Sequence, residues 1–244
     1  MTCCAICDKA IKEGEPFRRH RRRDLTGSVL ATSHTHKACR GRPTIVPFIA
    51  QWSGETASDP TVVLSPFSGV AYADETALDR DDRGVLWQRR PDSRGVGRPM
   101  YGKVHSGRQR QAMAGLLCHV CGGPADQDDR GVLWLLEDGA REYPQWPEDL
   151  MTVHPPICLD CIPLARQQCP HLWAGSVAVR VKASKACAVF GLRYTASRVG
   201  PIPVEGDIYP FESPLLPLVV ATQLVRALYD CTIVTLTEEL AAHA

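Results

Sequence analysis

The stretch Cys118-His-Val-Cys121-Gly-Gly and, after a gap of 36 residues, the stretch Cys158-Leu-Asp-Cys161 decide how this chain folds. Each stretch is a Cys-x-x-Cys pair, and together they supply the four thiolates that a closed tetrahedral zinc site requires. The chain begins without the charged segment and apolar run of a secretion signal, which indicates a reducing compartment. Regularly spaced cysteines there bind metal more often than they form disulfides. We therefore predict a structural zinc site at these four cysteines, in a cytoplasmic protein.

The chain between the two pairs must fold on its own, because the gap exceeds the span of about 15–20 residues in common four-cysteine sites. Gly131-Val-Leu-Trp-Leu-Leu136 predicts a strand, and Asp138-Gly139 is a hairpin turn signal. Residues 158–168 predict a helix that carries the second cysteine pair in its first turn. Knuckle, hairpin and helix in this order resemble a treble clef. The glycines after Cys121 permit the positive φ that turns backbone amides toward the sulfurs.

A second zinc site is predicted near the N-terminus. Cys4-Ala-Ile-Cys7 is followed, after 28 residues, by His36-Lys-Ala-Cys39, which gives a set of three cysteines and one histidine. Cys3 could replace Cys4, and His34 could replace His36, because each has a neighbour of the same kind. We favour Cys4 and His36, since both then keep the two-residue spacing of a zinc knuckle.

The remaining cysteines are predicted to be structural. Cys169 precedes Pro170 and ends the helix of the second pair, Cys187 lies in an alternating apolar segment, and Cys231 ends an apolar helix. Buried free cysteines of this kind behave as small apolar residues.

The hydrophobic pattern predicts an α+β fold that is rich in strands. Extended segments are expected at 44–52, 60–65, 69–73, 84–88, 176–194 and 232–235, and helices at 108–117, 217–230 and 236–242. The helix at 217–230 rests on apolar residues at three-to-four spacing after Pro217. The chain thus divides into a zinc-knuckle lobe (1–43), a strand-rich segment with a basic loop (44–110), a four-cysteine lobe (111–171) and C-terminal strands with a helix (172–244). Both zinc-stabilised lobes are expected to be treble-clef-like.

One sequence repeat is identical letter for letter. Asp81-Asp-Arg-Gly-Val-Leu-Trp87 recurs as Asp128-Asp-Arg-Gly-Val-Leu-Trp134, 47 residues later. Asp-Asp-Arg-Gly predicts a turn and Val-Leu-Trp the start of a strand. The knuckle cysteines do not recur, because Ala71 and Asp74 stand 47 residues before Cys118 and Cys121. We expect two related turn-and-strand units, of which only the second binds metal.

Charge alternates along a chain whose net charge is +1. Residues 1–48 carry +6, 49–87 carry −5, 88–110 carry +6 and 111–165 carry −7. Blocks of opposite sign favour pairing within the fold or with a partner that bears both signs. The net charge gives no general attraction to nucleic acid, and no apolar stretch is long enough to span a membrane.

The densest positive run offers an alternative, nucleic-acid-binding interpretation. Arg18, Arg19, Arg21, Arg22 and Arg23 lie on a predicted hairpin strand, and alternate residues of a strand share a face. About three of them could contact phosphates together. The basic segment 88–110 would add to this surface.

No motif of a nucleotide-binding loop, a dinucleotide fold or a nucleophile elbow is present. Both predicted zinc sites are filled by four protein ligands, whereas a catalytic zinc keeps one position open. The sequence therefore favours a non-catalytic protein that binds a protein partner.

Four segments carry a family resemblance: Gly84-Val-Leu-Trp, Arg108-Gln-Arg-Gln-Ala-Met, Cys118-His-Val-Cys-Gly-Gly-Pro-Ala-Asp126 and Pro156-Ile-Cys-Leu-Asp-Cys161. Over residues 60–235 the chain resembles a group of actinobacterial and Streptomyces-phage zinc-knuckle proteins. Its size and phage-like character are similar to the recombination directionality factors of Streptomyces temperate phages. That resemblance implies a protein that binds a DNA-bound large serine integrase and redirects its coiled coils. Recombination of attL with attR is then allowed, and that of attP with attB is disfavoured. No integrase-contacting residue follows from the resemblance.

Overall fold

The computed structural model describes residues 10–23, 29–36, 45–56, 60–65, 69–139 and 144–243 of the chain. The strands are β1 (Phe17–Arg23), β2 (Val29–His36), β3 (Ala50–Trp52), β4 (Val62–Ser65), β5 (Gly69–Tyr72), β6 (Leu86–Trp87), β7 (Pro99–Val104), β8 (Gln127–Asp128), β9 (Gly131–Glu137), β10 (Met151–Thr152), β11 (Ser176–Thr195), β12 (Ile202–Pro210) and β13 (Val219–Val234). The helices are α1 (Ser106–Gly115), α2 (Ile162–Gln168) and α3 (Leu236–His243), with short 3-10 helices η2 (Ser53–Glu55), η3 (Leu159–Cys161), η4 (Pro170–Ala174) and η5 (Leu216–Leu218).

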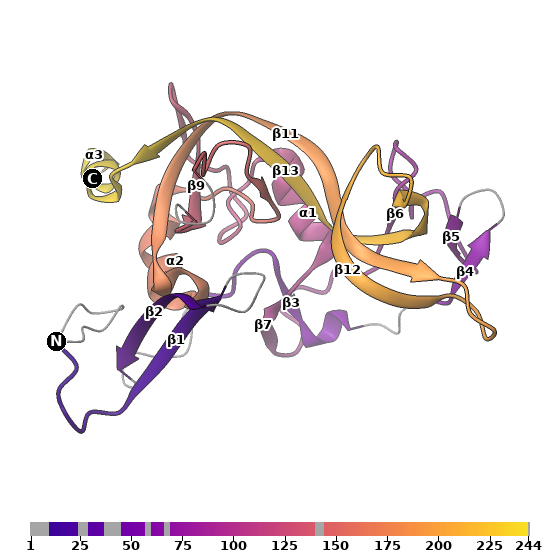
Figure 1. Cartoon of the computed structure of the whole chain (residues 1–244), viewed down its shortest axis with the longest axis horizontal. Helices are drawn as coiled ribbons and strands as arrows, with labels where there is room; N and C mark the ends of the chain where they lie inside the picture. Colours follow the sequence, from indigo (N-terminus) through magenta and orange to yellow (C-terminus); the bar gives the residue numbers. More distant parts are fainter. Residues whose placement is uncertain are drawn as a thin grey trace.

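Two long antiparallel strands, β11 and β13, lie at the centre of the largest sheet and run along the molecule (Figure 1). The first part of β11 pairs with β9, which in turn pairs with β8, and the last part of β11 pairs with β12. On its other side, β13 pairs with β10 and, in parallel, with β6. The same two strands therefore join a part that holds the cysteine pairs to a part that holds the β11–β12 hairpin.

The β11–β13 ribbon is bent rather than straight. Its register shifts between Ala186 and Ala188 and again between Phe190 and Gly191, and such bulges bend a strand and increase its twist. At the second shift the backbones approach closely. A Cβ added to Gly191 would lie 2.5 Å from the carbonyl oxygen of Val220. Glycine is required there because β13 occupies the space of a side chain.

The predicted helix at 217–230 is wrong, because residues 219–234 form the strand β13. Val219, Val220 and Val225 are buried, and β-branched residues favour strands over helices. A strand that is covered on both faces has a continuous apolar run instead of a strict alternation, so helical spacing can arise in it by chance. Cys231 accordingly lies near the end of a strand, not of a helix.

Other predicted elements are confirmed. The helix at 108–117 is α1, the final helix is α3, and the alternating segment 176–194 is β11. The helix expected at 158–168 starts as η3 and continues as α2. The strand-rich α+β character is also confirmed.

The hairpin expected at Asp138-Gly139 is wrong. The partners of β9 are β8 and β11, and the backbone amide of Asp138 donates to the carbonyl of Gly175. The hairpin lies instead at the other end of β9, in the turn Asp128–Gly131. The turn signal at 138 therefore marks the end of a strand whose neighbour comes from later in the chain.

The two copies of the repeat have the same local structure. Asp81 Oδ1 accepts from the amide of Arg83, and Asp128 Oδ1 accepts from the amide of Arg130, at 3.0 and 2.9 Å. In both copies the glycine has positive φ, and the following residues enter a strand, β6 or β9. The prediction of two turn-and-strand units is confirmed.

None of the helices in the described part of the chain is long and apolar enough to cross a bilayer.

The close approach at Gly191 gives a stability prediction. Gly191→Ala should destabilise the protein by about 1–3 kcal/mol, since the added methyl group overlaps the β13 backbone. Gly102→Ala in β7 is the matched control, because a Cβ there meets nothing within 4 Å. The free energies of unfolding in urea measure both effects. Equal values for the two variants would contradict the close approach.

Candidate metal centre

The first cysteine pair lies in a tight knuckle after α1. The helix ends at Leu116 in the left-handed conformation. The amide of Cys118 then donates to the carbonyl of Gly123 at 2.7 Å, and the amide of Gly122 to that of Cys118 at 2.8 Å. Gly122 has a φ of +80°, as predicted for a glycine after Cys121. The amide of Gly123 points at Cys121 Sγ, at 3.4 Å.

The second cysteine pair is positioned by backbone hydrogen bonds that Ile157, the residue before it, makes with β9 and with Asp126. The amide of Ile157 donates to the carbonyl of Leu133 in β9, and its own carbonyl accepts from Asp126. Cys158 follows directly as the residue that precedes η3, and Cys161 ends that turn. The short helix thus turns both sulfurs toward the knuckle.

The four predicted ligands Cys118, Cys121, Cys158 and Cys161 come together, with all four sulfurs within 4.8 Å of one another. The Sγ of Cys158 lies 3.6 Å from that of Cys118 and 3.8 Å from that of Cys121. Four sulfurs at about 2.3 Å from a zinc ion stand about 3.8 Å apart. The cluster therefore has the size of a tetrahedral zinc site and can hold such a metal.

The cluster is part of the core. Cys118 and Cys161 are buried together with Leu133, Ile157 and Ile162 from β9 and the second pair, whereas Cys121 is exposed. Leu236 and Leu240 of α3 pack against the same group. The cysteines thus lie where the knuckle, the sheet and two helices meet.

Burial governs the protonation of the metal-free thiols. It raises the pKa of Cys158 to about 12 and also raises that of Cys161. For Cys121, burial acts in the same direction, but the hydrogen bond from the Gly123 amide and those with the other thiols outweigh it, so its pKa is lowered. A bound cation would favour the thiolates, so metal binding releases protons.

His119 lies inside the knuckle but is not in the group of possible metal ligands that the four cysteines form. Its Nδ1 is 3.0 Å from the carbonyl oxygens of Pro155 and Pro156. The ring therefore ties the first knuckle to the segment before the second pair. It has a positioning role in the cluster.

The second predicted site falls largely outside the described residues. Cys4, Cys7 and Cys39, with the alternative Cys3, are not among them, and only the backbone of His36 is described, at the end of β2. His34 Nε2 accepts from Arg19 Nε at 3.3 Å. The N-terminal zinc site stays a prediction.

The hairpin expected for the arginine run is present, since β1 pairs with β2 from Phe17–His36 to Arg23–Val29. Arg18, Arg19, Arg21, Arg22 and Arg23 all lie on β1. The hairpin contacts η4 next to the four-cysteine lobe.

A buried ion-pair centre around Arg108 was not predicted from the sequence. The side chains of Arg108 and Glu55 are almost fully buried, and their closest atoms are 2.6 Å apart. Arg108 also contacts Asp92 at 2.6 Å and the carbonyls of Phe48 and Ala50. Glu55, Asp92 and His105 are near enough to one another for a metal, but the guanidinium of Arg108 already pairs with both carboxylates. We interpret this group as structural.

This centre supports the knuckle from outside. The amides of Phe48 and Ile49 donate to the carbonyls of Val120 and His119, and Arg108 binds the Phe48 carbonyl on the same segment. Burial would raise the pKa of Glu55, but the hydrogen bonds from Arg108 and the Trp52 amide outweigh it and the pKa is lowered. Arg108, a residue of the helix before the knuckle, thus also orders the segment at Phe48 and Ile49 that borders the knuckle.

Comparisons of the chain with known protein families, with curated proteins and with solved structures found no match.

Metal analysis tests the cluster. Cys161→Ser should lose one equivalent of zinc from the purified full chain, because three thiolates hold the ion far less tightly than four. Cys187→Ser is the control, since Cys187 lies in β11 outside the cluster. Equal zinc content in both variants would contradict a metal site here.

Removal of Arg108 tests the buried ion pair. Arg108→Met should cost about 3–5 kcal/mol in the free energy of unfolding, because Glu55 would be left as an unpaired buried charge. Arg98→Met, at an exposed position, should change it by less than about 0.5 kcal/mol.

The lowered pKa of Glu55 also fixes the sign of a pH effect. Its stabilising contribution is present above its ordinary pKa of 4.5 and is lost as the pH falls through the lower folded-state pKa. The stability of Glu55→Gln should therefore depend less on pH below 4.5 than that of the natural chain. Parallel pH profiles would argue against this assignment.

Proposed function

We propose that the Cys118, Cys121, Cys158 and Cys161 cluster holds a structural zinc ion and that the protein acts without catalysis, by binding a macromolecule. The observation that carries the proposal is the closed donor set, in which four thiolates leave no position for a substrate. Such a site supplies about 10–16 kcal/mol of apparent binding energy in zinc-finger peptides. That energy would stabilise the loop-rich segment between α1 and α2. A second structural zinc at Cys4, Cys7, His36 and Cys39 belongs to the same proposal, and Cys7→Ser should then lose an equivalent of its own.

The preferred partner is a large serine integrase on DNA, for which the protein would be a recombination directionality factor. Support comes from the family resemblance of residues 60–235 and from the metal cluster inside the core. Such a factor need only bind one synaptic arrangement better than the other. About 5.5 kcal/mol of differential binding moves a population from 1:99 to 99:1. Binding energy alone could thus reverse the direction of recombination.

The charge distribution favours a protein partner over bare nucleic acid. Arg89 of the basic segment pairs with Asp79 at 2.5 Å and with Asp74 at 2.9 Å, and Arg108 pairs with Glu55. These contacts join the positive block 88–110 to the negative block 49–87, as the alternating charges predicted. Two of the cations of that segment are therefore occupied within the fold.

The alternative is a zinc-stabilised nucleic-acid-binding protein that uses Arg18–Arg23 and the segment 88–110. The observation that favours it is the hairpin itself, which gathers five arginines on one strand, β1. Contacts with phosphates release counterions, so such binding weakens steeply with salt.

A recombination assay separates the two proposals. The protein should stimulate attL × attR recombination by its cognate serine integrase and should co-purify with that integrase without DNA. A mobility shift of DNA with the protein alone, measured at two salt concentrations, tests the alternative. Stimulation without a shift supports the directionality factor. No stimulation and no pull-down would reject it, and a salt-sensitive shift would then favour nucleic-acid binding.

A further inference from the structure

One stretch of the basic segment contains cations but no carboxylates. Residues 93–105 include Arg94, Arg98 and Lys103 and neither aspartate nor glutamate. All three side chains are exposed, and no ion pair joins them to another residue of the described part of the chain. Asp92, the carboxylate just before the stretch, pairs with Arg108 at 2.6 Å. Unlike Arg108, these three cations are therefore available to an anionic ligand.

Hydrogen bonds to η2 fix the loop 93–98, which carries the two arginines. The amide of Ser53 donates to the carbonyl of Arg98 at 2.9 Å, and Ser53 Oγ accepts from the amide of Arg98 at 3.0 Å. Gly97 has a φ of +84°, and a Cβ added to it would lie 2.2 Å from Ser53 Oγ. Glycine is therefore required at this position. The loop has a defined shape before any ligand binds, which lowers the entropy lost on binding.

Arg94 is positioned by an aromatic ring. Its guanidinium carbon lies 5.5 Å from the ring centre of Phe48, within the range of a cation–π contact. Phe48 is itself held against the cysteine knuckle, because its amide donates to the carbonyl of Val120 at 2.8 Å and its ring leaves no room for a side chain at Gly122. An arginine stacked on a ring keeps its charge and its planar fork of donors, which suits a phosphate.

The strand that follows the loop exposes an aromatic ring between the cations. β7 lies beside β3 (Figure 1) and pairs with it at Pro99 and Met100 and again at Val104. The three residues between, 101–103, have no residue of β3 opposite them in this register. Tyr101, in this bulge, is 47% exposed. An aromatic ring beside cations is the arrangement on which a base of a single strand stacks while its phosphates contact the cations.

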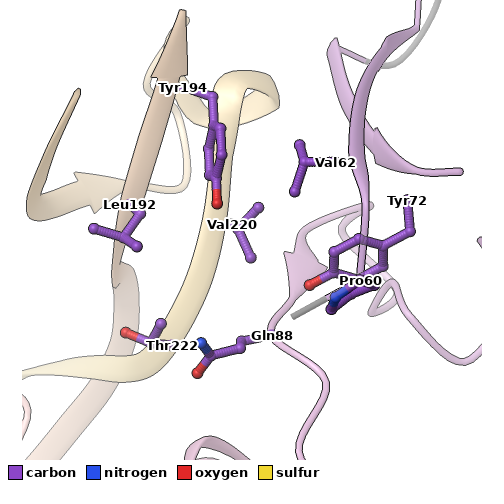
Figure 2. Close-up of a pocket in the computed structure, with 8 residues that line it drawn as sticks. All are labelled: Pro60, Val62, Tyr72, Gln88, Leu192, Tyr194, Val220 and Thr222. Atoms are coloured by element: carbon purple, nitrogen blue, oxygen red, sulfur yellow. The ribbon is translucent and has the colours of Figure 1, made fainter. Parts of the chain in front are cut away.

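A hollow elsewhere in the molecule fits an anion less well (Figure 2). Its lining offers hydroxyl and amide groups, but none of the eight side chains that line it is charged: Pro60, Val62, Tyr72, Gln88, Leu192, Tyr194, Val220 and Thr222. A phosphate in this hollow would meet no cation of the lining. The basic loop and the bulge of β7 are therefore the better site for a polyanion.

We propose that Arg94, Arg98, Lys103 and Tyr101 form a contact site for single-stranded nucleic acid, in which the three cations contact phosphates and the ring of Tyr101 stacks on a base. The proposal rests on three exposed cations that no carboxylate of the fold engages and on the exposed ring among them. It deepens the nucleic-acid alternative given above by naming its ligand and its residues. It requires neither an integrase nor the arginines of β1.

Fluorescence anisotropy of a labelled single-stranded DNA oligonucleotide, titrated with the full chain, tests the site. Three phosphate contacts predict a slope of about −2 for the logarithm of the binding constant against that of the salt concentration. The double variant Arg94→Gln, Arg98→Gln should bind at least about tenfold more weakly and reduce the slope to about −0.7, since one contact remains. Arg198→Gln is the matched control, because Arg198 is an exposed cation in the turn between β11 and β12.

Tyr101→Ala tests the stacking separately. It should weaken binding of the single strand by at least about fivefold, whereas Tyr101→Phe should retain it. Circular dichroism and zinc content should be unchanged, because the substituted side chains are exposed. No binding by the natural chain overturns the proposal, as does full binding by the double arginine variant, since β1 would then carry the contact. Equal affinity for a duplex together with unchanged binding by Tyr101→Ala overturns it as well. The assay contains no integrase, so its result is independent of the directionality proposal.

Discussion

The convergence of four sulfurs at one point of the core is the constraint on which this fold depends. Cys118 and Cys121 follow α1, whereas Cys158 and Cys161 precede α2, so one ion would connect the segments next to two helices, of which one precedes β9 in the sequence and the other follows it. Hydrogen bonds from Phe48 to Val120 and from Ile157 to Leu133 extend the connection to two further segments. A bound ion would add its binding energy to the apolar contacts that Leu133, Ile157 and Ile162 make around the cluster.

The two copies of the repeat, residues 81–87 and 128–134, have the same turn, but only the second lies between the two cysteine pairs. Asp79 and Asp126 stand 47 residues apart, and each accepts a guanidinium at 2.5 Å, from Arg89 and from Arg180. Asp74, which stands 47 residues before Cys121, also pairs with Arg89. An arginine between two carboxylates thus stabilises the first copy, and the second adds the four-cysteine cluster to a similar ion pair. The likeness of the two units extends beyond the seven identical residues.

Features that depend on neighbouring residues could be predicted from the sequence, whereas features that depend on distant segments could not. The cysteine spacing predicted all four members of the cluster, because each knuckle is formed within a few residues. The strand β13 was predicted as a helix, since what makes Val219–Val234 a strand is its burial between β11 on one side and β6 and β10 on the other. The Arg108 centre was missed because its partners Glu55 and Asp92 lie far away in the chain, and no spacing rule connects them.

The buried ion pairs also explain how strongly alternating charge coexists with a net charge of +1. Arg180 is buried among Asp126, Asp128 and Glu239, so a positive residue of β11 offsets part of the negative charge of the four-cysteine lobe and holds α3. Arg89 and Arg108 do the same for the first half of the chain. Charges paired in this way contribute less to the field outside the molecule than unpaired charges do. Long-range attraction to a polyanion would come from β1 and from exposed cations of the segment 88–110 such as Arg94 and Arg98, whereas contact with a protein surface needs no such field. The internal pairing of charge therefore serves to hold distant segments of the chain together.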